Sequence, residues 1–350
     1  MDVYLAAMMG IILSLCLPTT ISAAPPTVDA PHCRNIGCCS GRDDNCYVPI
    51  SNSEFGIAVC YCDDFCLRSA SSDCCTDFPL LCVQRQIDMG TLFSELWQAD
   101  DNRIDENQYS YELQSSKRDF KNYTDLSAGS LFTSFNEDHI FNKGTFKSFL
   151  PLCGYYEVMQ GVSENDTSNY LEQVQTYLDD VMDTRVMTIA TRHLKDAGFV
   201  SDKTDLREKI KAIWFTRYTR QAANDTSAFE HVFCGELKST SSASGLHNWI
   251  TLYREEKGGH LDYHGYTGLS VPNQIGVQYT WYDAIKPRTS VMLGISTEFE
   301  LAIFTAAWLF NPDEVTSFNY VEGDDVFQVD LQTWTSKDGD GQISSAYFLA

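Results

Sequence analysis

The segment 273–308, NQIGVQYTWYDAIKPRTSVMLGISTEFELAIFTAAW, decides the class of fold. Apolar side chains alternate along its first part, at Ile275, Val277, Tyr279 and Trp281. This period of two predicts a β-strand with one face in the core. Residues 297–300 (Thr-Glu-Phe-Glu) form a capping box, and the apolar run that follows, through Trp308, predicts a buried helix. A helix is therefore expected within a region of strands.

The segments on either side divide the chain into a helical part and a β-rich part. Alternation at Leu261 and Tyr263, and the β-branched and aromatic run Val326–Trp334, predict further strands. From Asp88 to about Gln221 the apolar spacing is mostly helical, with stripes at Leu92, Leu96 and Trp97 and, within Tyr170–Met187, at Leu171, Val174, Leu178 and Val181. We expect an α+β fold in which a helical N-terminal half packs on antiparallel strands.

Cysteines mark a separate module near the N-terminus. Ten of the 13 lie between Cys33 and Cys82, at positions 33, 38, 39, 46, 60, 62, 66, 74, 75 and 82. A zinc site is the alternative, but an apolar leader precedes them, so we favour disulfides formed in an oxidising compartment. About fifty residues bury too small a core to be stable alone, so these bonds must supply much of the stability of residues 33–83. Spacing alone leaves their pairing open.

The first residues are typical of a secreted protein. The apolar run from Val3 to Leu17 precedes small residues at 22–24, which predicts a signal peptide over residues 1–23. No later stretch is long and apolar enough to span a membrane, so we expect a secreted, extracellular monomer without an integral membrane segment. Three N-x-[ST] sequons are candidate glycosylation sites, at Asn122, Asn165 and Asn224.

The charge balance limits how the chain can bind nucleic acid. The 25 Lys and Arg against 48 Asp and Glu give a net charge of −23, which excludes a broad basic face. The stretch 228–291 is nearly neutral, with five basic and six acidic residues, whereas residues 313–330 carry six acids and no base. We interpret the acidic run as a solvated face that is also able to bind hard cations through oxygen ligands.

Among residues able to do chemistry, His231 and His247 have the most suggestive neighbours. Two imidazoles brought together suit an acid–base pair near neutral pH. A metal site completed by His260 and His264 is the alternative, disfavoured because the HExxH helix is absent and the segment alternates like a strand. Cys153 and Cys234 are expected to be paired or buried.

The sequence excludes two other motifs. The chain has no GxSxG nucleophile elbow. The stretch 336–343 (SKDGDGQI) imitates half of an EF-hand, but Ser336 takes the first position and Tyr347 the twelfth, so we predict a polar hairpin turn.

Three segments together carry a family resemblance: FEHVFCGELK (229–238), SGLHNWITLYREEKGGHLDYHGY (244–266) and IKPRTSVMLGISTEFELAIFT (285–305). They resemble the EndoU family of poly(U)-preferring endoribonucleases, over about residues 88–350. The resemblance implies antiparallel β-sheets that carry the active site, with His231, His247 and Lys286 as catalytic residues and Glu230 and Glu236 in support. It also implies substrate binding by Ser290, Ser345 and Tyr347, the last two within Ser344–Tyr347, which replaces the family's Gly-Thr-Ala-Tyr.

The implied activity is cleavage of single-stranded, uridine-containing RNA. Removing the proton of a 2′-hydroxyl makes an internal nucleophile and leaves a 2′,3′-cyclic phosphate. By analogy His247 is the base and His231 the acid, an order that the residues alone do not rank. The family is often stimulated by manganese or calcium, so a divalent cation on unassigned acidic ligands is expected.

The cysteine pattern resembles the somatomedin B domain, through Cys60-Tyr-Cys62, Cys66 and Cys74-Cys75-Thr-Asp-Phe. This implies a secreted type of EndoU protein whose module binds an extracellular protein partner. The alternative hypothesis is a catalytically weak or inactive matrix or adhesion protein that works through this module. A secreted hydrolase of another kind, such as a protease, lacks a matching nucleophile and base.

Overall fold

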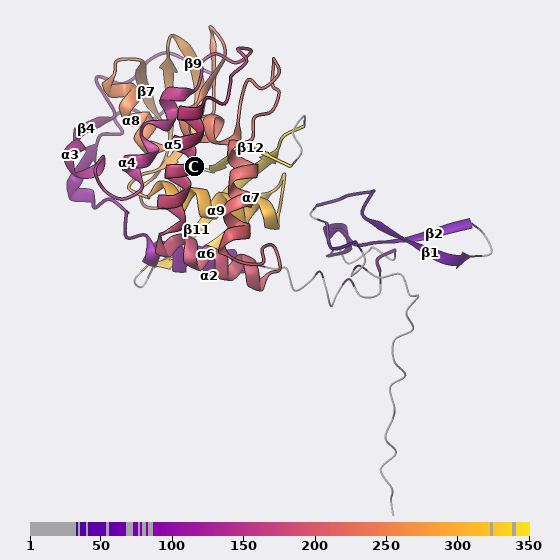
Figure 1. Cartoon of the computed structure of the whole chain (residues 1–350). Helices are drawn as coiled ribbons and strands as arrows, with labels where there is room; N and C mark the ends of the chain where they lie inside the picture. Colours follow the sequence, from indigo (N-terminus) through magenta and orange to yellow (C-terminus); the bar gives the residue numbers. More distant parts are fainter. Residues whose placement is uncertain are drawn as a thin grey trace, which may run out of the picture.

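The computed structural model describes residues 87–350 except 323–324 and 338–340, and residues 33, 36–39, 41–53, 56–67, 73–75, 78 and 82 of the module. The expected signal peptide, 1–23, and the centre of the expected hairpin turn, 338–340, lie outside the described residues. Figure 1 shows the chain, with the module's β1 and β2 and the larger domain that follows.

The module is a disulfide-linked β-hairpin. Strands β1 (Tyr47–Ser53) and β2 (Gly56–Tyr61) pair antiparallel, and a short 3₁₀ helix, η2 (Asp64–Leu67), follows. All ten cysteines are paired, as Cys33–Cys62, Cys38–Cys82, Cys39–Cys46, Cys60–Cys75 and Cys66–Cys74. The expected disulfides are confirmed, and the cysteine-rich module fits the somatomedin B-like interpretation.

The larger domain is α+β, as predicted. Its helical half contains α2 (Met89–Ala99), α3 (Glu137–Ile140), α4 (Phe146–Phe149), η5 (Leu152–Tyr155), α5 (Ser168–Met182), α6 (Arg185–Asp196) and α7 (Lys203–Phe215). A small hairpin interrupts these helices, formed by η4 (Glu106–Gln108), β3 (Tyr109–Tyr111) and β4 (Phe132–Phe135).

The β-rich half consists of two sheets. The first has the order β5–β6–β9–β8–β7 and contains β5 (Glu236–Ser239), β6 (Ser242–Ser244), β7 (Leu261–Leu269), β8 (Gln274–Trp281) and β9 (Ala284–Met292). The second contains β10 (Val315–Glu322), β11 (Asp325–Thr335) and β12 (Ile343–Phe348). Pairing is antiparallel except for a short parallel contact between β6 and β9.

Helix α9 (Thr297–Phe310) joins the two halves. Its first eleven residues are all buried, because α2 and α6 pack against it from the helical half and β11 and β12 from the second sheet. In Figure 1 it runs through the middle of the domain. Strand β12 lies against both β9 and the short helix η6 (Glu230–Cys234), which brings the two sheets together at one place.

The structure corrects three details of the sequence prediction. The stretch 170–187 is two helices, because α5 ends at Met182 and Thr184 caps α6. Leu171 is exposed, since the buried stripe of α5 consists of Tyr170, Val174, Tyr177, Leu178, Val181 and Met182. The cap of α9 is Ser296, not Thr297, and its side chain accepts a hydrogen bond from the Phe299 amide.

One long-range disulfide ties the helical half to the β-rich half. Cys153 in η5 is bonded to Cys234 in η6, which confirms the expectation that these cysteines are paired or buried. Within the described residues, the helices are all too short or too polar to cross a membrane.

Candidate active site

A cavity of about 340 Å³ opens where β9, β12, η6 and the turn before helix α8 (Trp249–Lys257) meet. Its lining consists of His231, Ser244, Gly245, His247, Lys286, Arg288, Thr289, Ser290, Trp334, Ser345, Tyr347, Leu349 and Ala350. Six of the eight residues that the family resemblance proposed are therefore brought together. The other two, Glu230 and Glu236, are fully buried behind the cavity wall.

A π-helix places the two histidines side by side. In η6 the Gly235 amide donates to the Glu230 carbonyl, five residues back. Two further carbonyls of η6 accept hydrogen bonds from the segment that carries His247. Leu246 N donates to His231 O at 3.0 Å, and His247 N donates to Val232 O at 2.7 Å. The imidazole centroids are consequently 6.5 Å apart. Single-turn π-helices are rare in proteins as a whole, but those that occur are often found at functional sites.

Gly245 is required at this crossing. Its φ is +66°, and a Cβ atom added there would lie 1.9 Å from the His231 carbonyl oxygen. Any side chain would therefore push the two histidine segments apart.

His231 is buried between opposite charges. Its Nδ1 lies 3.4 Å from Oε2 of Glu236, whose carboxylate also accepts from Thr226 and Gln160. Burial and the charge of Arg220 lower the pKa of His231 to about 4. Burial would raise the pKa of Glu236, but His231 and Arg220 outweigh it and lower that pKa to about 2. Glu236 is thus an ionised partner that favours the protonated form of the imidazole.

Glu230 holds the start of the π-helix. Ser227 N donates to the Glu230 carboxylate, and Glu230 N donates to the Ser227 hydroxyl, both at 3.2 Å. This reciprocal pair is a capping box. Burial, followed by the charge of Glu236, raises the pKa of Glu230 well above its usual range. The two glutamates therefore differ, one supporting the backbone and the other the imidazole.

His247 is held by Thr289 and Tyr347. The Thr289 hydroxyl donates to the Leu246 carbonyl at 3.0 Å and lies 3.0 Å from His247 Nδ1. Because its single proton goes to that carbonyl, the hydroxyl accepts from Nδ1–H, which assigns the unprotonated lone pair to Nε2. The Tyr347 ring stacks on the imidazole at 4.7 Å. Burial, then the charges of Lys286 and His231, lower the pKa of His247 well below its usual range.

Lys286 reaches the cavity from β9, paired in register with Tyr279. Burial lowers the pKa of its ammonium to about 7, partly opposed by Glu236. It is therefore a cation that titrates near neutral pH, facing two neutral imidazoles.

The other side of the cavity is suited to a planar ring. The Ser290 hydroxyl donates to the Phe348 carbonyl, so it presents lone pairs to a ligand. Ser345 pairs across the sheet with Trp334, which is 45% exposed. The sequence did not single out Trp334, Thr289 or Arg220. The one signal in it was that Trp334 falls on the exposed face of its predicted strand.

The remaining candidates lie elsewhere. His260 and His264 do not line the cavity: His260 contacts Glu255, and His264 contacts Asp262. In the described part of the chain, the grouping within metal-binding reach is Cys33, Cys62 and Cys75, and all three are in disulfides. Asn122, Asn165 and Asn224 are all exposed.

Two histidines and a lysine in one cavity of an α+β fold are suited to acid–base chemistry on an anionic substrate. The family model "Endoribonuclease XendoU" matches residues 88–348. The chain belongs to this family.

Relatives support the assignment along most of the chain. Uridylate-specific endoribonuclease B of Danio rerio is 35% identical over 247 residues, which cover 66% of this chain and 88% of the fish protein. The uridylate-specific endoribonuclease of Mus musculus is 29% identical and covers 83% of this chain and 74% of its own. Because residues 88–350 make up about three quarters of the chain, the mouse match extends into the residues before 88.

A solved structure has a similar fold. It is described as XendoU, a splicing independent snoRNA processing endoribonuclease, and superposes with a TM-score of 0.62 at 29% identity. The match covers 75% of this chain and 97% of that chain.

The Thr289 contact yields a prediction that needs no activity assay. Thr289→Val keeps the shape of the side chain and removes the hydroxyl, so Nδ1–H of His247 loses its acceptor. A hydrogen bond contributes about 0.5–1.5 kcal/mol net, so the tautomer ratio should move by up to about tenfold toward Nε2–H. The ¹⁵N chemical shifts of His247 measure this ratio, and Thr289→Ser should retain it. An unchanged ratio in Thr289→Val would contradict the assignment.

Proposed function

We propose that the protein is a secreted endoribonuclease that cleaves single-stranded RNA at uridines. The observation that carries this proposal is the convergence of His231, His247 and Lys286 in one cavity of a chain that belongs to an endoribonuclease family. The preference for uridine is transferred from the names of the fish and mouse relatives. Secretion is supported by the disulfides of the module and by Cys153–Cys234, since such bonds form in oxidising compartments.

In the proposed reaction the 2′-hydroxyl of the uridine attacks the adjacent phosphorus. Nε2 of His247 takes the hydroxyl proton, the O2′–P bond forms, and the bond between phosphorus and the next nucleotide's 5′-oxygen breaks. His231 donates a proton to that leaving oxygen. The products are a 2′,3′-cyclic phosphate and a free 5′-hydroxyl, so the reaction is formally that of a phosphorus–oxygen lyase. The nucleophile is already in the substrate, so positioned acid–base groups suffice.

The electrostatics of the cavity favour this division of roles. His247 is neutral at pH 7 and therefore ready to accept a proton. A bound phosphate adds negative charge, which together with Glu236 raises the pKa of His231 and so favours the protonated imidazole that acts as the general acid. Lys286 lies in a buried position where its charge strongly stabilises the negative charge that develops on the phosphate oxygens.

We assign the reading of uracil to Ser290, Ser345 and Tyr347. Uracil presents an N3–H donor where cytosine presents an acceptor, and the Ser290 oxygen is free to accept because its proton goes to Phe348. Ser345 supplies a second hydroxyl, and the Tyr347 ring supplies a flat face for the base.

The disulfide-rich module carries a second candidate role. Its ten paired cysteines hold a small rigid body outside the matched family region. We propose that it binds an extracellular protein partner. This role is compatible with catalysis, and it would be the working part if the nuclease domain were inactive.

Removing either histidine tests the catalytic assignment. Each positioned acid or base contributes about 10²–10⁴-fold to the rate, so His247→Ala and His231→Ala should each lower kcat by at least a hundredfold. The assay is cleavage of a labelled oligonucleotide with a single uridine, with circular dichroism to verify folding. The matched control is His260→Ala, which should cleave at the wild-type rate. Normal turnover by a folded His247→Ala protein would overturn the proposal.

The low pKa of Lys286 predicts a particular pH dependence. Lys286 is charged below about pH 7 and neutral above it, and the phosphate needs the charged form. The kcat/KM of the wild type should therefore fall as the pH rises above 7. In Lys286→Arg the guanidinium stays charged beyond pH 12, so the fall should be shallower even if the rate is lower. Identical alkaline limbs for the two proteins would exclude Lys286 as the titrating cation.

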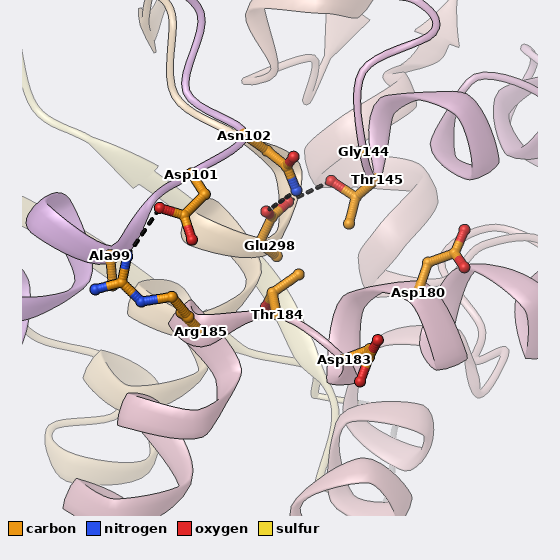
Figure 2. Close-up of a pocket in the computed structure, with 10 residues that line it drawn as sticks. All are labelled: Ala99, Asp101, Asn102, Gly144, Thr145, Asp180, Asp183, Thr184, Arg185 and Glu298. Carbon is orange, nitrogen blue, oxygen red and sulfur yellow. Dashed lines mark hydrogen bonds and ion pairs between the residues drawn. The ribbon is translucent and has the colours of Figure 1, made fainter.

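A divalent cation is the implied cofactor, and an acidic cavity of about 370 Å³ is the candidate place for it. Figure 2 shows Asp101, Asn102 and Glu298 grouped on one side of this cavity. Nearby, Asp100 Oδ1 is buried without a hydrogen-bond partner, and burial and the charge of Glu298 raise the pKa of Asp100 to about 7. Asp101 pairs with Arg185 at 2.9 Å, and the Glu298 carboxylate accepts from Asn102 and Thr145, so a hard cation such as Mn²⁺ or Ca²⁺ would take the place of these partners on the carboxylate oxygens.

We propose that Asp101, Asn102 and Glu298 hold this cation. When bound, it would offset the buried negative charge and reduce repulsion of RNA.

Thermal unfolding tests the cation site independently of activity. Millimolar Ca²⁺ or Mn²⁺ should raise the Tm of the wild type by several degrees over its value in chelator, because a ligand of the folded state stabilises it. Glu298→Gln should lose most of that shift, whereas Asp262→Asn, a change on the exposed side of β7, should keep it. Equal shifts in all three proteins would place the cation elsewhere.

A further inference from the structure

The loop between β3 and β4 carries a surface that the catalytic assignment does not use. Residues 117–126 read KRDFKNYTDL, in which basic and aromatic residues are interleaved. Phe120, Tyr123 and Leu126 expose 43%, 50% and 45% of their surface. We call residues 117–126 the basic–aromatic loop. Proteins that bind single-stranded nucleic acid commonly do so with exposed aromatic rings, on which bases stack, and with cations that contact phosphates.

The loop is anchored to the sheet. Lys117 N donates to the Tyr266 carbonyl at 2.7 Å, and Leu126 N donates to the His264 carbonyl at 3.1 Å, both on β7. Gln278 on β8 donates from one amide nitrogen to the Phe120 carbonyl at 2.9 Å and to the Pro287 carbonyl at 3.2 Å. Pro287 stands between Lys286 and Arg288, which both line the cavity. A single side chain therefore bridges the loop and the catalytic strand.

The local charge is suited to phosphate. Asp119 and Asp125 turn their carboxylates to backbone amides of Lys121 and Ser127 within or next to the loop. Arg118 and Lys121 have no ion pair among the described residues, and both are exposed. In a chain with a net charge of −23, these two cations form a local exception, on a loop that Gln278 joins to the strand of Lys286 and Arg288.

We propose that the basic–aromatic loop binds the nucleotides that flank the scissile uridine. Bases stack on Phe120 and Tyr123, and Arg118 and Lys121 contact the phosphates. This inference rests on the proposed ribonuclease function and extends it to longer substrates. The sequon at Asn122 lies between the two rings, so a glycan there would cover the surface and favour short substrates.

The experiment uses the full chain with Asn122→Gln, so that a glycan cannot cover the loop. Two substrates are compared: the dinucleotide UpA, which fills only the cavity, and a twelve-nucleotide RNA with one central uridine. Binding is measured by fluorescence anisotropy on the same long strand with 2′-deoxyuridine at the uridine position, which removes the nucleophile. Phe120→Ala/Tyr123→Ala is the test variant. Tyr155→Ala, a similarly exposed ring on η5, is the matched control.

The aromatic variant should bind the long strand about tenfold or more weakly, because each stacked base contributes substantially. Its kcat/KM on UpA should equal that of the parent, and the control variant should match the parent on both substrates. Arg118→Gln/Lys121→Gln should lower the slope of log K against log salt by about 1.4, because each phosphate contact on a single strand contributes about 0.7.

The outcomes separate this inference from the proposed function. Unchanged affinity in the aromatic variant, or an equal loss on UpA and on the long strand, would overturn the role of the loop. A parent protein that binds the long strand through the loop but cleaves neither substrate would refute the nuclease and leave the loop as an RNA-binding surface.

Discussion

Two backbone hydrogen bonds hold the site together, from the amides of Leu246 and His247 to the carbonyls of His231 and Val232. They are possible because η6 ends at Cys234, so the carbonyls of its last turn have no partner within the helix and are available to a second segment. The same bonds demand glycine at position 245, where a Cβ atom would strike the His231 carbonyl. Cys153–Cys234 fixes the far end of this helix to the helical half.

Burial gives the converged side chains their chemical character. Both imidazoles and the ammonium lose water, so each pKa falls and none of the three is locked in its charged form. Glu236 is the exception, since His231 and Arg220 keep it ionised. A cavity of nearly neutral bases beside one anion is ready to be charged by an incoming phosphate. At neutral pH the attraction for a phosphate comes from Arg288 and from the charged fraction of Lys286, which both line the cavity, so it is local within an acidic chain.

The sequence predicted part of the β-rich half, since alternating residues and a capping box mark β7, β8, β11 and α9, whereas β5, β6, β9, β10 and β12 were not predicted. It singled out His231 and His247 from their neighbours, but it reached Lys286 and the other cavity residues only through family resemblance. These residues lie far apart in sequence, and a period of two or 3.6 does not reveal which strands meet. The amino-acid sequence of η6 does not indicate that the segment forms a π-helix. Arg220 contacts Tyr218, Ser344 and Glu236, and Thr289 contacts Leu246 and His247, and neither set of contacts follows a sequence pattern. Leu171 was misplaced because tyrosines take part of the buried face of α5.

The central claim is that the substrate's own 2′-hydroxyl is the nucleophile, activated by His247. The most direct measurement is ³¹P NMR of the products from an oligonucleotide with one uridine, beside a strand that carries 2′-deoxyuridine at that position. We expect the resonance of a 2′,3′-cyclic phosphate from the first strand and no cleavage of the second. Cleavage of the deoxy strand, or a linear phosphate as the first product, would contradict it.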